Sequence, residues 1–422
     1  MLTTTRFFAA SRCLILASVG VMSSLPGFGQ YFDSSSASGL TPAPTAVNWQ
    51  SNVWQSFDSP GTTPPGAWAD GGDAYFQTGG TNLVNITNEV NVRDLTQSVT
   101  GTSTILGGNG TLTLTGAAVI NGSGSNLQFL SGLSLLIQPT GLSFEFRASS
   151  SDILIDAVLK GGSALEKTGS GTLYLNRANV LTGNITLSGG VTEIGSAAAL
   201  GTGRLIINGA TLRYGRGVAD DVSDQLDPIG AGGAVINTNG GLINFSSALS
   251  GSGTLTKQGT GILVLNAASP SYTGQIVVNE GTLAINPATT GTTATILGTS
   301  GSTAVNGVLV KNGATLDLSG GGTANEPFNE YIALEGRGVN GQGALIKNGG
   351  QNQSAMNVYL TGHTTIFNNS RIDMDNVFDA AVQSHQVGNW GTAAGRGQHQ
   401  KPGQRLREAG DAELQWRRGH GL

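Results

Sequence analysis

Short segments of alternating apolar and polar residues, each bounded by glycine, recur along this chain of 422 residues. In Thr172-Leu173-Tyr174-Leu175 the two leucines lie on one face of a strand, because successive side chains of a strand point to opposite sides. A strand of this length cannot bury its apolar face by itself. Stacked coils that share one continuous core solve the problem, so the pattern predicts a solenoid of short strands.

One of these segments occurs twice, at an offset of 90 residues. Residues 165–176 read LEKTGSGTLYLN, and residues 255–266 read LTKQGTGILVLN. A degenerate third copy begins another 90 residues on, at Leu345. The positions that define the repeat are Leu165, Lys167, Gly171, Leu173, Leu175, Asn176 and Gly183 in the first copy, Leu255, Lys257, Gly261, Leu263, Leu265, Asn266 and Gly274 in the second, and Leu345 and Lys347 in the third.

Each kind of repeat position has an expected place. The leucines should face a common core, and the glycines should allow sharp corners between strands. The asparagines follow a strand directly, where their amides can bond to turn backbone. The recurring lysines are interpreted as exposed side chains that flank turns, not as catalytic groups.

The pattern L-x-K-x-G-x-G-x-L-x-L, closed by Asn and followed by T-G, resembles the autotransporter-associated β-strand repeat. Residues 165–194 and 255–285 carry it clearly, and residues 345–375 carry it loosely. The chain departs from it at Thr192, where the second copy has Leu283, and in the third copy after Gly350. The resemblance implies a right-handed parallel β-helix displayed outside the cell.

Composition agrees with an all-β chain of many turns. Glycine contributes 66 residues, against an ordinary usage of roughly 7%. Apolar residues reach 38%, which argues against disorder, and charged residues only 11%. The net charge of −5 and the lack of a basic face make nucleic acid an improbable partner. We find no apolar run long enough to span a bilayer after the N-terminus.

Residues 1–29 have the pattern of a signal peptide. Arg6 and Arg12 supply a basic start, residues 13–22 form a short apolar core, and Gly27-Phe28-Gly29 offers a cleavage site. The only cysteine, Cys13, lies in this segment. The mature chain would therefore lack disulfides, which fits export of a chain that is stabilised by stacking.

Three further segments are expected. Residues 30–98 contain Trp49, Trp54 and Trp68 and are interpreted as a cap over the open end of the solenoid, with an aromatic carbohydrate-binding platform as the alternative. Residues 99–390 should form the parallel β-helix. Residues 391–422 are charged and lack strand alternation, so they are either a basic attachment tail or a segment read out of frame. The second case would place a membrane anchor outside this chain.

Candidate chemistry is weak. Asp220, Asp221, Asp224 and Asp227 form the densest acidic group and are a possible Ca²⁺ site, although a solvated loop explains them as well. A second group, Asp373, Asp375 and Asp379, suggests paired carboxylates of a glycosidase. His363 and His385 lack the spacing of a zinc site. No serine-nucleophile elbow and no phosphate-binding loop occurs, so we expect no cofactor and assign no catalytic residue.

The leading hypothesis is a secreted or cell-surface structural or adhesive rod of a bacterium. It would bind extracellular glycans or the surfaces of host or neighbouring cells through weak, multivalent contacts. The alternatives are an extracellular enzyme that acts on polysaccharides through an acidic groove, and a passive scaffold for a module that lies elsewhere. An enzyme would need two or three carboxylates that converge on one face.

Overall fold

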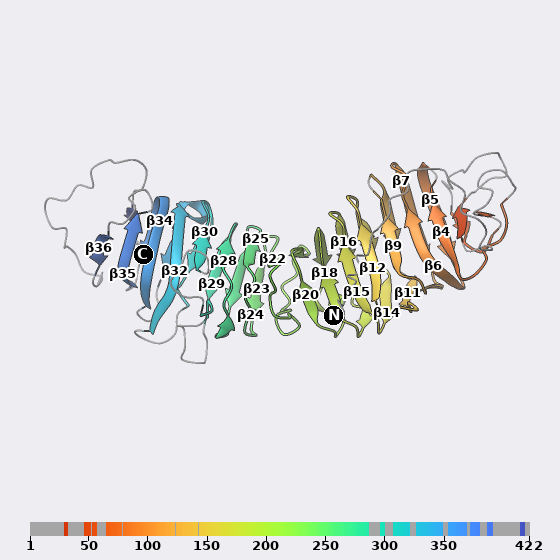
Figure 1. The fold of residues 1–422 in the computed structure, drawn as a ribbon. Helices are drawn as coiled ribbons and strands as arrows, with labels where there is room; N and C mark the ends of the chain where they lie inside the picture. The colour runs from red at the N-terminus through yellow and green to blue at the C-terminus, as the bar shows by residue number, and fades with distance from the viewer. Residues whose placement is uncertain are drawn as a thin grey trace, which may run out of the picture.

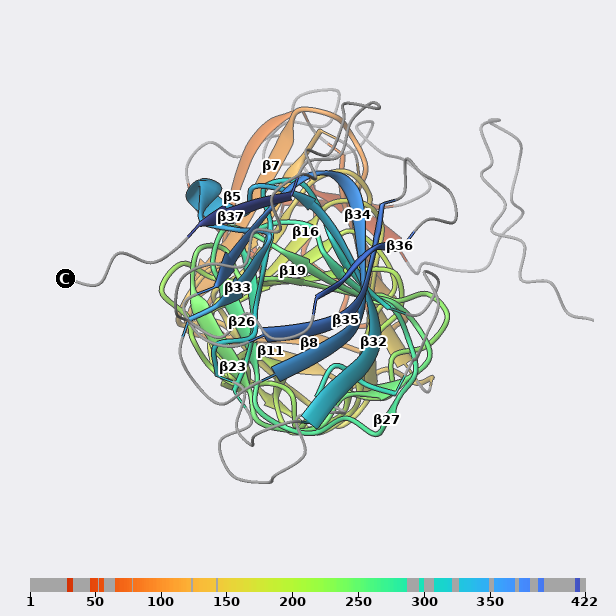
Figure 2. The same cartoon turned by 90° about the vertical axis from the view of Figure 1, so that its left-hand side faces the viewer.

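The computed structural model describes most of the chain between residues 29 and 417. The described residues are 29–32, 46–51, 53–56, 65–77, 79–122, 124–141, 143–286, 296–299, 307–320, 326–348, 353–368, 372–379, 386–390 and 414–417. They form an elongated rod, which Figure 1 shows from the side and Figure 2 along its axis. The strands wind around this axis, and most of them pair with strands of the coils before and after them.

The predicted all-β parallel solenoid is confirmed, because almost every strand pair is parallel and links successive coils. No α-helix occurs in the described part, where the helical segments are two 3-10 turns, η1 (Ala197–Leu200) and η3 (Val339–Gly341). A parallel neighbour must be reached by a crossover, and here the rest of the coil provides it.

The N-terminal half presents three faces. Face 1 holds β8 (Thr111–Leu114), β11 (Ser134–Ile137), β14 (Val158–Gly161) and β17 (Val180–Leu181). Face 2 holds β9 (Ala118–Asn121), β12 (Ser143–Ala148), β15 (Ala164–Thr168), β18 (Ile185–Leu187) and β20 (Leu205–Ile207). Face 3 holds β5 (Gly80–Ile86), β7 (Thr102–Gly108), β10 (Asn126–Phe129), β13 (Ile153–Ile155), β16 (Thr172–Leu175), β19 (Val191–Ile194) and β21 (Thr211–Tyr214). The long strand β6 (Glu89–Gln97) bends over two faces and pairs with both β8 and β9.

The C-terminal half continues the same stacking with two long columns. One contains β22 (Ala234–Asn237), β25 (Leu255–Gln258), β28 (Ile276–Val278), β30 (Val308–Val310) and β32 (Glu326–Gly336). The other contains β23 (Leu242–Phe245), β26 (Ile262–Leu265), β29 (Thr282–Ile285), β31 (Thr315–Asp317) and β33 (Leu345–Lys347). The short strands β24 (Ser250–Gly251) and β27 (Ser271–Tyr272) pair at a corner. At the end lie β34 (Gln353–Asn368), β35 (Ile372–Asp379), β36 (Gln386–Trp390) and β37 (Leu414–Arg417).

Aromatic side chains gather in the N-terminal part of the rod. Trp49, Trp54, Phe32 and Phe76 are buried, with ring centroids 4.6 to 6.0 Å apart along the contacts that join them. Trp68 packs beside them, 4.7 Å from Trp54. Here β1 (Gly29–Phe32) pairs antiparallel with β3 (Trp54–Ser56) and parallel with β4 (Gly72–Phe76), and β2 (Val47–Asn48) pairs with β5. Buried tryptophans fit the predicted cap better than an open binding platform.

The proposed domain boundaries stay predictions. Parallel pairing already includes β5 and β6, within the segment that the sequence analysis treats as a cap. Residues 1–28, which hold nearly all of the predicted leader, lie outside the described residues. In the predicted tail only the backbone of β37 is described, and it pairs in parallel with β34.

The leucines that open the three repeat copies face the core, as predicted. Leu165 is 5% exposed, and Leu255 and Leu345 are 0% exposed. Leu173 and Leu263, in the following strand of the first two copies, are also buried. Burial of each such side chain contributes about 1.5–3 kcal/mol, and stacking makes this burial possible for strands of three to five residues.

The repeat glycines mark the points where successive coils approach most closely. A Cβ on Gly171 would overlap the carbonyl oxygen of Ser151, and a Cβ on Gly261 that of Gly241. Gly183 and Gly274 have the same relation to Ser163 and Gly253 in the coil before. These glycines are therefore required by backbone proximity more than by their own turn geometry.

The two clear repeat copies do not lie on the same face. Thr172 of the first copy opposes Val191, which opposes Thr211, and the column continues through Val235 to Thr256 of the second copy. Thr172 lies in the second strand of the first copy, β16, whereas Thr256 lies in the first strand of the second copy, β25. The same column thus holds different strands of the two copies, and the second copy has advanced by one strand. The offset of 90 residues is four coils plus one strand.

The change of face occurs in the junction, which we define as residues 215–233. Before the junction, face 3 holds β16, the second strand of the first repeat copy, and ends with β21. After it, β22 continues the same column, which next holds β25, the first strand of the second copy. Isolated bridges join Leu205 to Leu226 and Ile229 to Gly251, so the junction is itself stacked between its neighbours. The columns of strands continue across the junction, and its extra residues move the repeat pattern of the sequence forward by one face.

Substitution of a stacking glycine tests the close approach. We expect Gly171→Ala and Gly261→Ala to lower the free energy of unfolding by about 1–3 kcal/mol each, because the methyl group overlaps backbone that cannot move independently. Gly79→Ala is the control, since a Cβ there meets nothing within 4 Å. Thermal unfolding followed by circular dichroism measures the difference, and equal stability of all three variants would contradict the stacking argument.

Candidate functional site

The repeat lysines point into the solenoid, so the prediction that they are exposed is wrong. Lys167 is 1% exposed, and Lys257 and Lys347 are 0% exposed. Each stands two residues after a buried leucine in the same strand, and alternation places both side chains on the inner face. The Leu-x-Lys spacing therefore already indicated that the lysine side chains point inward. We call these three sites the lysine corners.

Lys167 lies at the corner between β15 and β16. Its Nζ donates to the carbonyl oxygens of Thr168 at 2.9 Å and Gly169 at 3.0 Å, both in its own turn. A third bond of 3.1 Å reaches the carbonyl oxygen of Gly189 in the next coil, 22 residues further along the chain. An ammonium group has three N–H donors, so all of them are used.

Lys257 repeats this geometry between β25 and β26. Its Nζ donates to the carbonyl oxygens of Gln258 at 2.9 Å, Gly259 at 2.6 Å and Glu280 at 3.0 Å. Glu280 belongs to the next coil, and its carboxylate accepts a bond of 2.9 Å from the backbone N–H of Gly259. The same two turns are thus joined by two independent contacts.

Lys347 forms the third corner after β33. Among the described residues its Nζ donates to the carbonyl oxygen of Leu318, 29 residues earlier in the preceding coil, at 3.0 Å. Because the repeat advances by one strand per copy, the three lysines lie in three different columns. Lys167 is paired across strands with Phe146 of β12, and Lys257 with Ile236 of β22. Lys347 lies in β33, which pairs with β31 of the third column.

Burial makes these ammonium groups easier to deprotonate. Desolvation lowers the pKa of each lysine from 10.5 to about 8. A nearby carboxylate opposes the shift in each case: Asp152 for Lys167, Glu280 for Lys257 and Asp317 for Lys347. The direction follows from the transfer of a charge out of water, which the carboxylates offset only in part.

The repeat asparagines act on the outside of the rod. Asn176 donates from its amide to the carboxylate of Asp156 in the preceding coil at 2.6 Å. Asn266 donates to the carbonyl oxygen of Phe245, also in the preceding coil, at 3.3 Å. Neither bond reaches the backbone of a turn, because Asn176 binds a side chain and Phe245 is the last residue of β23. Thr192, where the first copy departs from the repeat, faces inward and its hydroxyl is without a hydrogen-bond partner.

Asp220 and Asp221 of the junction bind backbone of neighbouring coils. Asp220 accepts a bond of 2.7 Å from the N–H of Ala197. Asp221 accepts bonds of 2.8 Å from the N–H groups of Ser223 and Ser246. Burial raises the pKa of Asp221, but the hydrogen bonds from Ser223 and Ser246 outweigh it, so the pKa lies below its usual value.

Asp224 and Asp227 lie on another side of the junction, around Arg204. The guanidinium donates to the carboxylate of Asp227 and to the carbonyl oxygen of Asp224, at 2.7 and 2.8 Å. Across the described part of the chain, no three His, Cys, Asp or Glu side chains gather in a way that could hold a metal ion. Of the four aspartates predicted as a weak Ca²⁺ site, Asp220 and Asp221 thus bind backbone of neighbouring coils, Asp227 binds Arg204, and Asp224 contributes its backbone carbonyl to Arg204.

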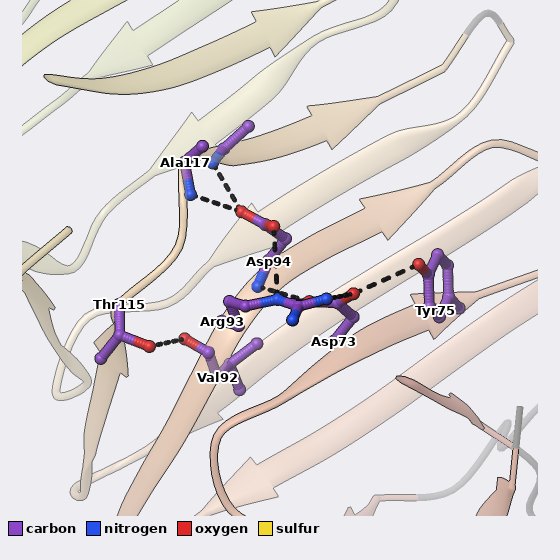
Figure 3. Close-up of polar contacts among 8 residues, drawn as sticks. Asp73, Tyr75, Val92, Arg93, Asp94, Thr115 and Ala117 are labelled. Carbon is purple, nitrogen blue, oxygen red and sulfur yellow. Dashed lines mark hydrogen bonds and ion pairs between the residues drawn. The ribbon is translucent and has the colours of Figure 1, made fainter. Parts of the chain in front are cut away.

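A polar network holds an N-terminal corner and was missed at the sequence level (Figure 3). Asp73 is 8% exposed and accepts two bonds from Arg93, one of them from Nε at 2.7 Å. The hydroxyl of Tyr75 donates to the same carboxylate at 3.4 Å. Burial and the neighbouring Asp73 raise the pKa of Tyr75 to about 12. Asp73 stands where the register between β4 and β6 shifts.

Asp94 continues this network into the next coil. One carboxylate oxygen accepts from the N–H groups of Ala117 and Ala118, at 2.6 and 2.8 Å. Ala118 begins β9 and Ala117 directly precedes it. Both follow Gly116, where a Cβ would overlap the carbonyl of Arg93. The carboxylate therefore replaces strand pairing at the point where the chain turns from one face to the next.

Other predicted candidates lie apart from these sites. His363 is exposed, and His385 lies outside the described residues. Asp373, Asp375 and Asp379 lie in β35, whose side chains are not among the described ones. Over the part of the chain that the structure describes, no helix is long and apolar enough to cross a membrane.

The geometry defines a parallel β-solenoid whose corners are held by buried lysines and by carboxylates that bind backbone. Comparison with known proteins finds a repeat family and a relative to which this chain is similar. The passenger-associated-transport-repeat matches residues 165–194 and 255–285, the two clear copies, so the predicted resemblance is confirmed. The loose copy at 345–375 lies outside the matched residues.

One relative extends the similarity beyond the repeats. The chain is 29% identical over 241 residues to a protein of Brucella suis biovar 1 (strain 1330) named adhesin BmaC autotransporter. The alignment covers 54% of this chain and 6% of that relative, so the chain spans a small fraction of its length. No solved structure matches the chain.

The buried lysines predict an unusual pH dependence of stability. The folded-state pKa of about 8 lies below the value of 10.5 for an unperturbed lysine. Between these values the unfolded chain binds more protons, so the free energy of unfolding should increase as pH rises from about 8. Denaturant titrations between pH 7.5 and 9.5 measure this increase.

The window ends at pH 9.5 because tyrosines act in the opposite direction. Burial raises the pKa of Tyr214 and Tyr272, so the unfolded chain loses their protons first and stability declines at higher pH. A variant with Lys167, Lys257 and Lys347 replaced by Met should show a flat profile in the same window. A wild-type profile that is flat or falls would contradict the burial of charge.

Removal of the Asp94 carboxylate should destabilise the N-terminal corner. We expect Asp94→Ala to lower the free energy of unfolding by about 1–3 kcal/mol, because the N–H groups of Ala117 and Ala118 lose their acceptor. Glu89→Ala is the matched control, since Glu89 is an exposed carboxylate on the same strand. Hydrogen exchange at residues 117 and 118 should rise in the first variant only. Unchanged exchange would mean that water replaces the carboxylate without cost.

Proposed function

We propose that this chain is part of an exported adhesive rod of a bacterial cell surface. The observation that carries the proposal is the similarity to an autotransporter adhesin over 54% of the chain, combined with two passenger repeats in a parallel solenoid. A rod of this kind works through its length and its outer faces. The pattern of a signal peptide at residues 1–29 supports export, and the outer cell surface is the proposed location.

An outer column without charges is the proposed contact face. Its side chains point away from the core, are half-buried by their neighbours and follow one another coil by coil across the junction. We call it the Thr/Val stripe; its members are Thr172, Val191, Thr211, Val235, Thr256 and Val277. Coils stack about 4.8 Å apart, so the stripe offers a regular row of methyl and hydroxyl groups.

A second outer column lies beside the stripe. Tyr174, Glu193 and Arg213 follow one another in it. Arg213 donates from Nε to Glu193 at 2.5 Å, and its guanidinium carbon lies 5.8 Å from the centre of the Tyr174 ring. The charges in this column thus satisfy each other, which leaves hydroxyl groups, an aromatic ring and apolar methyls for a partner.

Neutral glycans are the proposed partner class, on the surface of a host or neighbouring cell. A sugar presents hydroxyl groups beside apolar ring faces, and this matches the alternation of hydroxyl and methyl groups in the stripe. Single contacts of this kind are weak, and a long row gains strength because neighbouring sites bind the same polymer or surface. The proposed mode of action therefore depends on stiffness and repetition.

The polysaccharide-active enzyme finds less support. Its chemistry needs two carboxylates at a fixed separation across a bound sugar. The carboxylates of Asp94, Asp220, Asp221 and Asp227 instead accept hydrogen bonds from the protein's own backbone or from Arg204. We therefore propose the adhesive role and keep no catalytic residue.

Charge placed in the stripe tests the proposed contact face. Thr211→Lys and Thr256→Lys together should reduce binding to glycan arrays and to whole cells by about tenfold or more, because a lysine in each of two coils interrupts a multivalent row. Thr186→Lys, the same change on face 2, is the control and should bind as wild type. Equal loss in the control would point to a nonspecific charge effect, and no loss in either would exclude the stripe as the contact face.

A further inference from the structure

Many strands of this solenoid have similar apolar patterns, so more than one alignment between neighbouring strands would bury their side chains. Residues 165–176 and 255–266 have almost the same pattern, and most inward positions hold Leu, Ile or Val. A parallel strand that slips by two residues keeps its apolar side chains inside. Hydrophobic burial alone therefore distinguishes poorly between the native stack and a shifted one.

Charged side chains on the inside do distinguish them. Among the described residues the buried charged side chains are Asp73 and the three lysines of the lysine corners. At Lys167 and Lys257, carbonyl oxygens of two successive turns meet the ammonium within 3.1 Å. The carbonyls of Gly169, Gly189, Gly259 and Glu280 lie between strands, where the coil changes direction and regular ladder pairing stops. Thr168 and Gln258 end their strands, and the carbonyl of Gln258 also accepts from the backbone N–H of Thr238.

A slip of the stack would separate the ammonium from its acceptor in the next coil, while the two acceptors in its own turn would move with it. If β25 moved by two residues toward the start of β28, Lys257 would oppose Ile276 in place of Val278 and lose the carbonyl of Glu280. A buried ammonium with one N–H left without an acceptor is more costly than a displaced leucine. The same reasoning applies to Lys167, whose partner in the next coil is Gly189.

We propose that Lys167, Lys257 and Lys347 are register locks that determine which turn stacks on which, and that they act on three different columns in succession. The advance of the repeat by one strand per copy places each lock at a new corner. A shift of register that avoids one lock would therefore meet another within a few coils. Buried polar groups fix register in other stacked folds at some expense of stability.

The lowered pKa of these lysines agrees with a role in fixing the register at some expense of stability. Burial of the charge is unfavourable relative to water, so the contacts do not act mainly as stabilisers. The inference does not depend on the adhesive role, because it concerns only how the rod assembles.

The test compares refolding with stability in the full chain. We expect Lys257→Met to have a melting temperature equal to or above that of wild type, because Met fills a similar volume without a charge. After dilution from denaturant, however, the fraction that returns to one native state should fall by about fivefold or more, since shifted registers are no longer penalised. Hydrogen exchange with mass spectrometry over residues 250–285 should show two populations in place of one.

Lys311→Met is the matched control, because Lys311 is an exposed lysine in the same half of the rod. It should refold as wild type. A Lys257→Met variant that refolds to a single state with wild-type yield would overturn the proposal. A large fall in its melting temperature with unchanged refolding would also overturn it, since the lysine would then be an ordinary stabiliser.

A second variant covers the case in which Lys257→Met does not fold. Lys257→Gln keeps two N–H donors at the corner and removes the charge. The proposal expects this variant to recover a single register, with a yield above that of Lys257→Met. A Lys257→Gln chain that also fails to fold, under conditions in which Lys311→Met folds, would assign the lysine to stability and exclude the register role.

Discussion

Pairing of each coil with the coils before and after it is the interaction on which the rest of this rod depends. Strands of three to five residues bury their apolar face only when neighbours extend it, and the core runs continuously from the aromatic cluster at Trp49 to Ile366. The close approach that makes this possible excludes a side chain at several corners. Glycines such as Gly171 and Gly261 are thus a condition of stacking, and they explain the glycine-rich composition better than loop flexibility does.

The corners are where the chain changes direction and where backbone groups lose their strand partners. Two kinds of side chain meet this need. Carboxylates accept from backbone N–H groups there: Asp94 from the start of β9, and Asp221 from Ser246, directly after β23. Lys167 and Lys257 donate to the carbonyls of Thr168 and Gln258, which end their own strands. Charged residues are scarce in this chain, at 11%, and the corners use several of them. The Thr/Val stripe holds none.

The length of a coil decides which face each repeat copy occupies. The junction at residues 215–233 adds residues between two strand pairs and so moves the repeat motif forward by one face, while the outer column from Thr172 to Val277 runs straight across it. A contact face can therefore be continuous although the sequence motif rotates around the rod. Conversely, the copies of one motif lie on different faces of the rod, so the three lysine corners lie in three different columns.

The sequence by itself determined the class of fold, the inward position of Leu165, Leu255 and Leu345, and the resemblance to passenger repeats, because alternation and glycine spacing are local properties of the chain. It also contained the inward position of the lysines in the Leu-x-Lys spacing, although the charge suggested the surface. Only the tertiary structure decided that Lys257 meets the carbonyl of Glu280, that the junction aspartates bind two different neighbours, and that the second copy lies one face further on. The physical reason is that corner lengths vary from coil to coil, so an offset of 90 residues fixes no angle around the axis until every corner has been folded.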